Sequence, residues 1–433
     1  MKKKYLALLV LPLIFILVGS FLTGPVKSAS KTELRWYLRW DNARLEAVAK
    51  PVIEDYQKLN PNVEIILENV GSGNEYWMRL QTMLAADSCP DVVYPATHQA
   101  YLLSQNKQLI NLMPFVKRDK IDLKAYIPAV LDFYMEKDVL FGLPIDTASL
   151  VIFYNKDMFD EAGVPYPTDN MTWDELITMS KKLVKDKDGD GRIDQYALHL
   201  DSNIYWKIVT YHMTGKMLFD DLKNPTKLLL KNKDQIQAIQ YFADMMVKHH
   251  IAPTPSMRAD ISDMFLAGNA AMNIIGHWRV PTYNKSVKFN WDVAALPRGK
   301  YPANRGDGSC FAISKDTKNP EAAWEFVKYL AGPDAPGVKK LLSLGQMVPA
   351  QTALLDSDLF LKTPGQRLIN KKAFLAWNNV LLSPYQPFHE IFNEVDNTIR
   401  AAFAELWEGK ISAEQAVKNA TPKLETLLLE ASL

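Results

Sequence analysis

Strand-like and helix-like segments alternate regularly near the N-terminus of the chain. Residues 33–38, 63–67 and 91–94 are rich in aliphatic and aromatic side chains, which favours strands. The two intervening segments, 45–56 and 76–86, repeat apolar residues at helical spacing. A β-α-β-α-β order predicts a parallel sheet with crossover helices, and therefore an α/β fold.

The same alternation continues through the rest of the chain. Further strands are predicted at 139–144, 150–154, 270–275 and 291–295, and further helices at 235–249, 319–330 and 413–429. Thr172 and Glu175 have the spacing of a capping box, which opens another helix. Because 433 residues exceed the usual size of one domain and no low-complexity linker is present, we expect two hinged lobes between which the chain crosses more than once.

The N-terminus has the order of a secretory signal. Lysines at positions 2–4 precede a non-ionic, mostly apolar run at 5–22, and small residues follow at 28–30. We therefore expect residues 1–30 to be a signal peptide and the protein to be periplasmic or otherwise extracytoplasmic. The alternative is an uncleaved membrane anchor, because a run of 18 residues reaches the lower limit of a membrane span.

Charge and cysteine content exclude several classes of partner. The chain has 50 Lys+Arg against 49 Asp+Glu, and loss of residues 1–30 removes four lysines and no acid, so the mature net charge falls from +1 to −3. This balance argues against nucleic acid, which requires a clustered cationic surface. Two cysteines cannot form a four-thiolate metal site, although Cys89 and Cys310 could either pair or remain free thiols.

No catalytic motif is present in the sequence. The chain lacks the G-x-S-x-G elbow, the G-x-G-x-x-G fingerprint, the P-loop and the H-E-x-x-H pair. The pair His249-His250 lies at a predicted helix end, where a structural role is expected. We therefore expect a protein that is not an enzyme and that requires no cofactor.

One acidic segment resembles a calcium loop. Carboxylates occupy positions 1, 3, 5 and 9 of the pattern and glycine occupies position 6, but Ala197 stands at position 12, where a bidentate glutamate belongs. The alternative is a solvated acidic turn; if calcium binds, its role would be structural. The candidate residues are Asp186, Asp188, Asp190, Arg192 and Asp194.

Seven of the ten tryptophans fall into two groups. Trp40, Trp206 and Trp278 are predicted to lie in loops near strand ends, beside polar neighbours. An aromatic ring covers the C–H face of a sugar while neighbouring polar groups bind its hydroxyls, so these three tryptophans suit a carbohydrate site. Four others fall inside predicted helices or strands and are expected in the core: Trp173, Trp291, Trp324 and Trp407.

Several short motifs, in order, resemble the extracellular solute-binding proteins of ABC importers, in particular the carbohydrate-binding group that includes maltose-binding protein. The motifs are PDVV at 90–93, GLPI at 142–145, IFYNKD at 152–157, FLAGNAAM at 265–272, GHW at 276–278, AALP at 294–297, GDG at 306–308 and ISK with NPEAAW between 313 and 324. Each motif is short, but together they cover nearly all of the mature chain.

The resemblance implies a particular architecture. It implies the two-lobe periplasmic-binding-protein fold of type II, with hinged lobes and a central cleft. The N-terminal lobe would comprise residues 31–145 plus 308–358. The C-terminal lobe would comprise residues 146–307 plus 359–433.

Site residues also follow from the resemblance. The implied ligand-binding residues are Trp40, Asp41, His98, Asp146, Tyr205, Trp206, Trp278, Gly308 and Tyr385, with Phe388 as a further aromatic candidate. Ala148 stands where maltose-binding protein has an acid, and Asp146 lies two residues earlier. This departure argues against a maltose-like ligand.

The resemblance implies a monomeric carrier that captures a sugar or oligosaccharide and delivers it to the transmembrane subunits of an ABC permease. One alternative keeps this role but changes the ligand to a glycerol-phosphate-type anion, for which Arg39, Ser309 and Arg279 are candidate donors. A second is a secreted carbohydrate-active enzyme, which would need two carboxylates flanking the bond. A third is a tethered sensor, if the N-terminal run is uncleaved.

Overall fold

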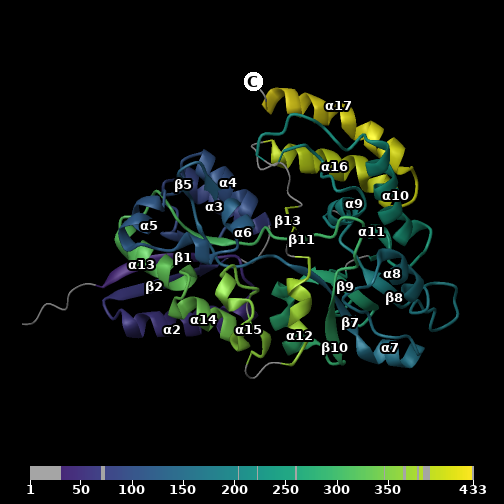
Figure 1. Ribbon diagram of the computed structural model, residues 1–433, viewed down its shortest axis with the longest axis horizontal. Helices are drawn as coiled ribbons and strands as arrows, with labels where there is room; N and C mark the ends of the chain where they lie inside the picture. The colour runs from purple at the N-terminus through teal and green to yellow at the C-terminus, as the bar shows by residue number, and fades with distance from the viewer. Residues whose placement is uncertain are drawn as a thin grey trace, which may run out of the picture.

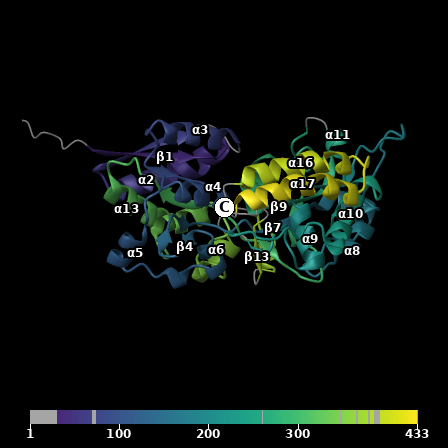
Figure 2. The same ribbon diagram turned by 90° about the horizontal axis from the view of Figure 1, so that it is seen from above.

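A computed structural model describes most of the chain beyond its N-terminal segment. The described residues are 31–69, 74–202, 204–221, 223–258, 261–345, 347–363, 367–377, 380–383 and 391–431. They form two α/β lobes that lie side by side, with the last two helices on the second lobe (Figures 1 and 2). The prediction of a two-lobe α/β fold is therefore confirmed.

The N-terminal lobe is built on a five-stranded sheet in the order β2-β1-β3-β12-β6. Its strands are β1 (Thr32–Leu38), β2 (Val63–Asn69), β3 (Val92–Val93), β6 (Leu143–Pro144) and β12 (Cys310–Ile313). β1 is parallel to β2 and β3, as predicted, whereas β12 is antiparallel to β3 and β6. The chain therefore returns to this sheet after passing through the other lobe.

Helices cover both faces of this sheet, with α2 and α14 on one side and α3 and α4 on the other (Figure 1). They are α1 (Asn42–Arg44), α2 (Lys50–Leu59), α3 (Asn74–Ala85), α4 (Thr97–Gln105), α5 (Met113–Asp119), α6 (Pro128–Asp132), α13 (Pro320–Ala331), α14 (Pro336–Ser343) and α15 (Asp358–Leu361). A π-helical turn, Leu45–Ala49, leads into α2. The predicted apolar stripe is buried at Leu45, Val48, Val52 and Tyr56.

The C-terminal lobe is built on a four-stranded sheet in the order β10-β7-β9-β8. Its strands are β7 (Leu150–Asn155), β8 (Tyr196–His199), β9 (Ala270–Gly276) and β10 (Trp291–Ala295). β7 is antiparallel to β9 and β10, and β8 is parallel to β9. All six residues of β7 are buried, which explains its continuous apolar sequence.

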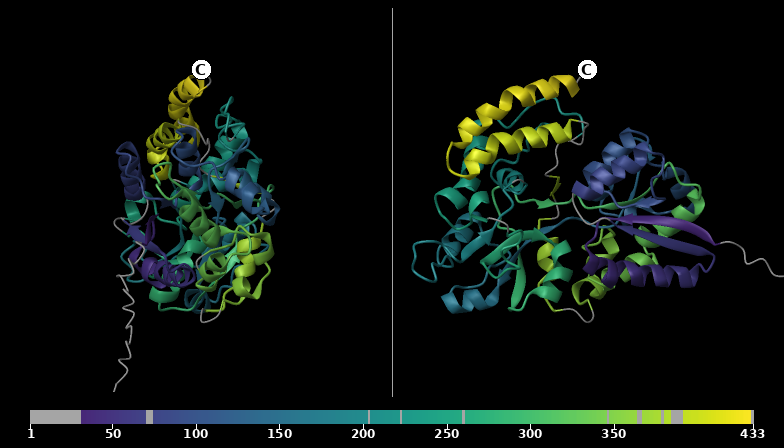
Figure 3. Two further views of the ribbon diagram at one scale, coloured as in Figure 1. Left: turned by 90° about the vertical axis from the view of Figure 1, so that its left-hand side faces the viewer. Right: turned by 180° about the vertical axis from the view of Figure 1, so that it is seen from behind.

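Eight α-helices are described around this second sheet. They are α7 (Lys156–Ala162), α8 (Trp173–Ser180), α9 (Trp206–Thr214), α10 (Lys233–Val247), α11 (Pro255–Arg258), α12 (Val280–Ser286), α16 (Phe392–Trp407) and α17 (Ala413–Ala431). The predicted capping box is present at the start of α8, where Thr172 and Glu175 hydrogen-bond reciprocally. α16 and α17 form a helical pair beside α10 (Figure 3).

The strand predicted at 139–144 is wrong as a single element. It is divided into β5 (Val139–Leu140), which pairs with β4 (Met135–Glu136), and β6, which pairs with β12. Gly142 lies at the break, where a Cβ atom would come within 2.4 Å of the Cys310 sulfur. The close approach of β12 therefore separates two strands that the sequence presents as one apolar run. A further small pair joins β11 (Asn304–Arg305) to β13 (Leu381–Leu382).

Buried aromatic residues and thiols fill both lobes. Trp173, Trp291, Trp324 and Trp407 are each 3% exposed or less, which confirms their predicted place in the core. Cys89 and Cys310 are both buried free thiols, so of the two possibilities the structure has the unpaired one. Burial raises the pKa of the Cys89 thiol to about 11.

Two further predictions concern the N-terminal segment and the lobe boundaries. The expected signal segment, 1–30, lies outside the described residues. Within the described residues, no helix is long and apolar enough to cross a membrane. The lobe boundaries at 145/146, 307/308 and 358/359 stay predictions.

Candidate ligand-binding site between the lobes

The loop after β1 brings the first candidate residues to the site. Trp40 is 1% exposed and packs edge-on against Tyr94, with ring centroids 5.6 Å apart. Its indole Nε1 is buried and has no hydrogen-bond partner among the described residues. Asp41 is exposed, and its Oδ1 accepts the backbone N–H of Arg44 at 2.8 Å as an N-cap. The structure thus gives Trp40 an unused donor and gives Asp41 a helix-capping contact.

Arg39, in the same loop, contacts two neighbouring segments. Its guanidinium lies 5.1 Å from the centre of the Tyr94 ring and donates to the Tyr94 carbonyl at 3.3 Å. Its Nη2 also donates to the Ser309 hydroxyl. This residue therefore links the end of β3 to the segment that precedes β12.

The first turn of α4 faces both the returning segment and the other lobe. The Thr97 hydroxyl lies 2.8 Å from the Tyr134 hydroxyl and donates to the Gly308 carbonyl at 3.1 Å. The His98 ring lies 4.9 Å from the ring of Phe392, at the start of α16 in the other lobe. Burial, with cationic neighbours as smaller causes, lowers the pKa of His98 to about 3. His98 is therefore neutral at physiological pH.

Asp146 joins the segment that first crosses between the lobes to the segment that returns. Its Oδ1 accepts the Ser309 N–H at 2.8 Å, and its Oδ2 lies 3.4 Å from His277 Nε2 at the end of β9. A Cβ atom at Gly308 would come within 2.1 Å of the Asp146 carbonyl oxygen. The close approach that Gly308 permits in this structure is therefore to Asp146.

Tyr205 and Trp206 lie at the start of α9, not in the open loop that the sequence suggests. Both are buried, at 5% and 1% exposed, and Trp206 packs against Phe403 of α16 with ring centroids 5.2 Å apart. The next residue, Lys207, is 3% exposed and lies 3.4 Å from an Asp396 oxygen. Desolvation lowers the pKa of the Lys207 ammonium. A segment almost two hundred residues later thus covers Trp206.

Trp278 keeps a half-buried position in the 3₁₀ turn after β9, His277–Arg279. Its ring folds back over Gly276, where a Cβ atom would come within 1.9 Å of it. The guanidinium of Arg305 lies 5.5 Å from the ring centre. Of the three predicted loop tryptophans, Trp278 alone is not fully buried.

Arg305 and Asp307 form a buried ion pair close to Trp278. Arg305 Nε donates to an Asp307 oxygen at 2.6 Å, and both side chains are at most 10% exposed. Desolvation raises the pKa of the Asp307 carboxyl, an effect that the pairing with Arg305 opposes. We call the contacting side chains from both lobes the inter-lobe site; it comprises Arg39, Trp40, Tyr94, Thr97, His98, Asp146, Lys207, His277, Trp278, Arg305, Asp307, Ser309, Phe392 and Asp396.

Sequence reasoning missed several members of this site. Lys207, Arg305 and Asp396 take part in buried ion pairs that no local motif predicts, whereas Asp307 stands inside the GDG motif at 306–308. His277 could have been found, because it stands inside the GHW motif beside Trp278. The predicted Tyr385 and Phe388 lie outside the described residues.

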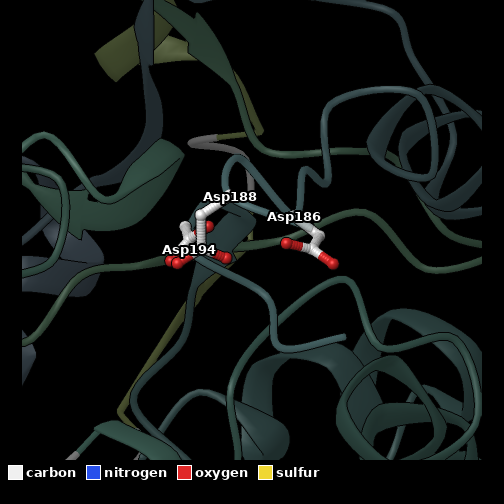
Figure 4. Close-up of side chains that lie close together, drawn as sticks. All are labelled: Asp186, Asp188 and Asp194. Atoms are coloured by element: carbon white, nitrogen blue, oxygen red, sulfur yellow. The ribbon is translucent and has the colours of Figure 1, made fainter. Parts of the chain in front are cut away.

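The acidic segment forms a separate, exposed cluster. Carboxylate oxygens of Asp186, Asp188 and Asp194 all lie within 4.8 Å of one another (Figure 4). Asp186 accepts the N–H groups of Gly189 and Gly191 at 2.7 and 2.8 Å, and these backbone contacts lower the pKa of its carboxyl. Asp190 and Arg192 belong to the same turn, since the Arg192 N–H donates to an Asp190 oxygen, but Asp190 lies outside the close group of three.

The chain is similar to known bacterial proteins. The profile of the family described as bacterial extracellular solute-binding protein matches residues 41–335, which is more than half of the chain. The chain belongs to this family. An arabinooligosaccharide-binding protein of Bacillus subtilis is 26% identical over 357 residues, covering 79% of each chain. A sn-glycerol-3-phosphate-binding periplasmic protein of Pectobacterium atrosepticum is 23% identical over 326 residues, covering 71% of each.

The solved structures agree with the two-lobe architecture. An ABC substrate-binding protein of Listeria monocytogenes, in complex with cycloalternan, superimposes with a TM-score of 0.80. It is 22% identical, and the match covers 92% of this chain and 98% of that one. This extracellular solute-binding protein therefore has the fold that the motif order implied.

Proposed function

We propose that this protein captures a carbohydrate between its lobes and delivers it to the transmembrane subunits of an ABC permease. The observation that carries the proposal is the inter-lobe site, where aromatic rings and polar side chains from distant segments meet. Trp278 offers a half-buried indole for stacking, and Trp40 offers a buried N–H that has no partner among the described residues. Rings beside hydrogen-bonding groups suit the alternating C–H and O–H surfaces of a sugar.

The names of similar proteins support a saccharide ligand. The Bacillus subtilis relative is named for arabinooligosaccharides, and the Listeria structure contains cycloalternan. A non-catalytic role is part of the proposal: Asp146 and Asp307 both contact nearby protein cations or N–H groups, whereas a glycosidase needs an acid and a base or nucleophile directed at the bond.

Contacts between the lobes support a mechanism in which ligand stabilises the closed state. His98 of one lobe touches Phe392 of the other. Lys223, in the loop after α9, donates to the carbonyls of Asp132 and Met135 at 3.1 and 2.8 Å, at the end of α6. A ligand that contacts both lobes adds to these interactions and shifts the population toward closure.

The remaining parts of the proposal follow from the sequence. Residues 1–30 would act as a cleaved signal peptide, so that the carrier works as a monomer outside the cytoplasmic membrane. Calcium, if it binds at Asp186, Asp188 and Asp194, would have a structural role away from the ligand.

A thermal-shift screen against mono- and oligosaccharides tests the proposed function. A ligand that binds only the folded state raises stability by RT ln(1 + [L]/Kd), or about 2.7 kcal/mol at a hundredfold excess over Kd. We expect at least one saccharide to raise the melting temperature by several degrees. Turnover of a glycoside by the purified protein would contradict the carrier role.

A further inference from the structure

The carboxylates of the inter-lobe site are already engaged by protein groups. Asp146 uses one oxygen for the Ser309 N–H and places the other against His277. Both Asp307 oxygens accept from Arg305, at 2.6 and 3.3 Å. Few strong acceptors are thus left for the hydroxyl protons of a neutral sugar.

The third carboxylate of the site is shared between two cations. One Asp396 oxygen lies 3.4 Å from the Lys207 ammonium, and the other accepts from Arg400 Nε at 2.5 Å. Lys207 is almost fully buried, so its charge is not compensated by water. The Asp396 carboxylate is therefore also engaged by protein cations.

Arg39, unlike Lys207, is not paired with an acid among the described residues. Among the described residues its guanidinium bonds only to a backbone carbonyl and a serine hydroxyl, and no carboxylate lies within ion-pair distance. Arg35, four residues earlier on β1, is by contrast paired with Glu68 at 2.5 Å. A guanidinium has five N–H donors in a planar fork, and this shape matches a carboxylate or phosphate group.

Two ring nitrogens of the site are buried with no hydrogen-bond partner among the described residues. Trp40 Nε1 can only donate, whereas His277 Nδ1 donates or accepts according to its tautomer. Charges of both signs act on one common neighbour: after burial, which is the largest cause, Arg39, Arg305 and Lys207 lower the pKa of His98 and Asp396 raises it. The inter-lobe site thus has three cations against three carboxylates, but all three carboxylates are engaged by protein groups, whereas Arg39 has no acidic partner among the described residues.

From this imbalance we propose that the inter-lobe site takes an anionic saccharide, whose carboxylate or phosphate group is bound by Arg39. The inference rests on the proposed function, because it names the class of ligand for the same site. A neutral sugar would leave Arg39 without an acidic partner, whereas an anionic sugar completes the pair. Carboxylate and phosphate groups are both oxyanions that a guanidinium can bind. A uronate would supply the carboxylate, and a sugar phosphate would supply the phosphate.

Isothermal titration with matched ligands tests this inference. The panel pairs galactose oligomers with galacturonate oligomers, glucose with glucuronate and with glucose 6-phosphate, and glycerol with sn-glycerol 3-phosphate. We expect the charged member of a binding pair to bind at least tenfold more tightly at low salt, with a smaller difference at higher ionic strength. The uronate and phosphate arms identify which oxyanion the site prefers.

Two variants assign the effect to Arg39. Arg39→Gln is expected to lower affinity for the charged ligand at least tenfold and affinity for its neutral counterpart by a smaller factor, and a cooperative melting transition without ligand shows that the variant is folded. Arg39→Lys, which keeps the charge but loses the fork, is expected to fall between wild type and Arg39→Gln. Arg35→Gln serves as the matched control and is expected to retain the full preference.

The outcomes separate the inference from the proposed function. Neutral saccharides that bind as tightly as their charged counterparts overturn the anionic class but leave a sugar carrier in place. An unchanged preference in Arg39→Gln also overturns the assignment. If the folded protein binds no saccharide of either kind, the proposed function fails together with the inference.

Discussion

Two polar regions of this protein are organised in opposite ways. In the acidic loop, exposed carboxylates such as Asp186 accept N–H groups from residues three and five positions later. In the inter-lobe site, Asp146 bonds to Ser309 and Lys207 pairs with Asp396, across 163 and 189 residues of sequence. The acidic loop can therefore be recognised from a short stretch of sequence, whereas the residues of the inter-lobe site come together only after the lobes have folded.

The two regions also differ in how strongly their charged groups affect the free energy of unfolding. Exposed ion pairs and acidic turns contribute little to stability, because water solvates their charges in the unfolded and folded states alike. Buried charges depend on their partners, since removing one leaves the other in a medium of low polarity. Substitutions in the inter-lobe site should therefore have much larger effects than substitutions in the acidic loop.

The largest effect is expected for Asp396→Ala. This change leaves the buried Lys207 ammonium without its carboxylate, and it is expected to lower the free energy of unfolding by roughly 3–5 kcal/mol. The matched control is Glu394→Ala, which removes the partner of Lys423 in an exposed pair of the same helix. Chemical denaturation measures both variants, and equal losses would contradict the distinction between buried and exposed charges.

The next effect is a dependence on pH that comes from His98. Its pKa of about 3 in the folded state is below the ordinary value near 6.5, so the unfolded chain binds a proton first as the pH falls. Stability is expected to decline from pH 6.5 toward pH 3 by up to about 1.4 kcal/mol per pH unit. His98→Gln is expected to flatten this decline in acid denaturation curves, whereas the exposed control His250→Gln would leave it intact.

A smaller effect is expected for Trp278→Ala. Loss of the half-buried indole is expected to weaken a saccharide that binds the wild type at least tenfold, or about 1.4 kcal/mol, as measured by titration. Trp206→Ala provides the comparison, because this tryptophan packs against Phe403 and its loss should mainly lower stability. An unchanged affinity in a folded Trp278 variant would remove Trp278 from the site.

The smallest effect is expected for Asp188→Asn in the acidic loop. Without calcium, this exposed substitution is expected to change the free energy of unfolding by less than about 0.5 kcal/mol. With millimolar calcium, the wild type is expected to melt at a higher temperature and Asp188→Asn to lose most of that gain. Absence of any calcium-dependent shift in the wild type would leave the segment as a solvated acidic turn.

Several helices and strands of the two lobes could be predicted from the sequence because their signals are local. Periodic apolar residues marked β1, α2 and α10, and the spacing of Thr172 and Glu175 marked the start of α8. The prediction failed at 139–144, where the contact between Gly142 and Cys310 depends on the returning chain.

The site was predictable only in part, for the same reason. His98, Asp146 and Trp278 were reached through short motifs, and the structure places all three in the inter-lobe site. The sequence predicts Trp206 in a loop, because Phe403, the residue that packs against its ring, lies almost two hundred residues later. The Lys207–Asp396 pair has no local signature, because acidic and basic residues at such positions are common on solvated surfaces, whereas Asp307 stands in the GDG motif without its pairing to Arg305 being evident there.

Hydrogen–deuterium exchange with and without the tightest ligand from the screen tests the central claim most directly. Binding between the lobes predicts slower exchange in residues 94–99 of one lobe, in residues 275–279 of the other and in the segments 144–149 and 305–309 that connect them. Protection confined to one lobe, or to the acidic loop at 186–194, would contradict a ligand site between the lobes.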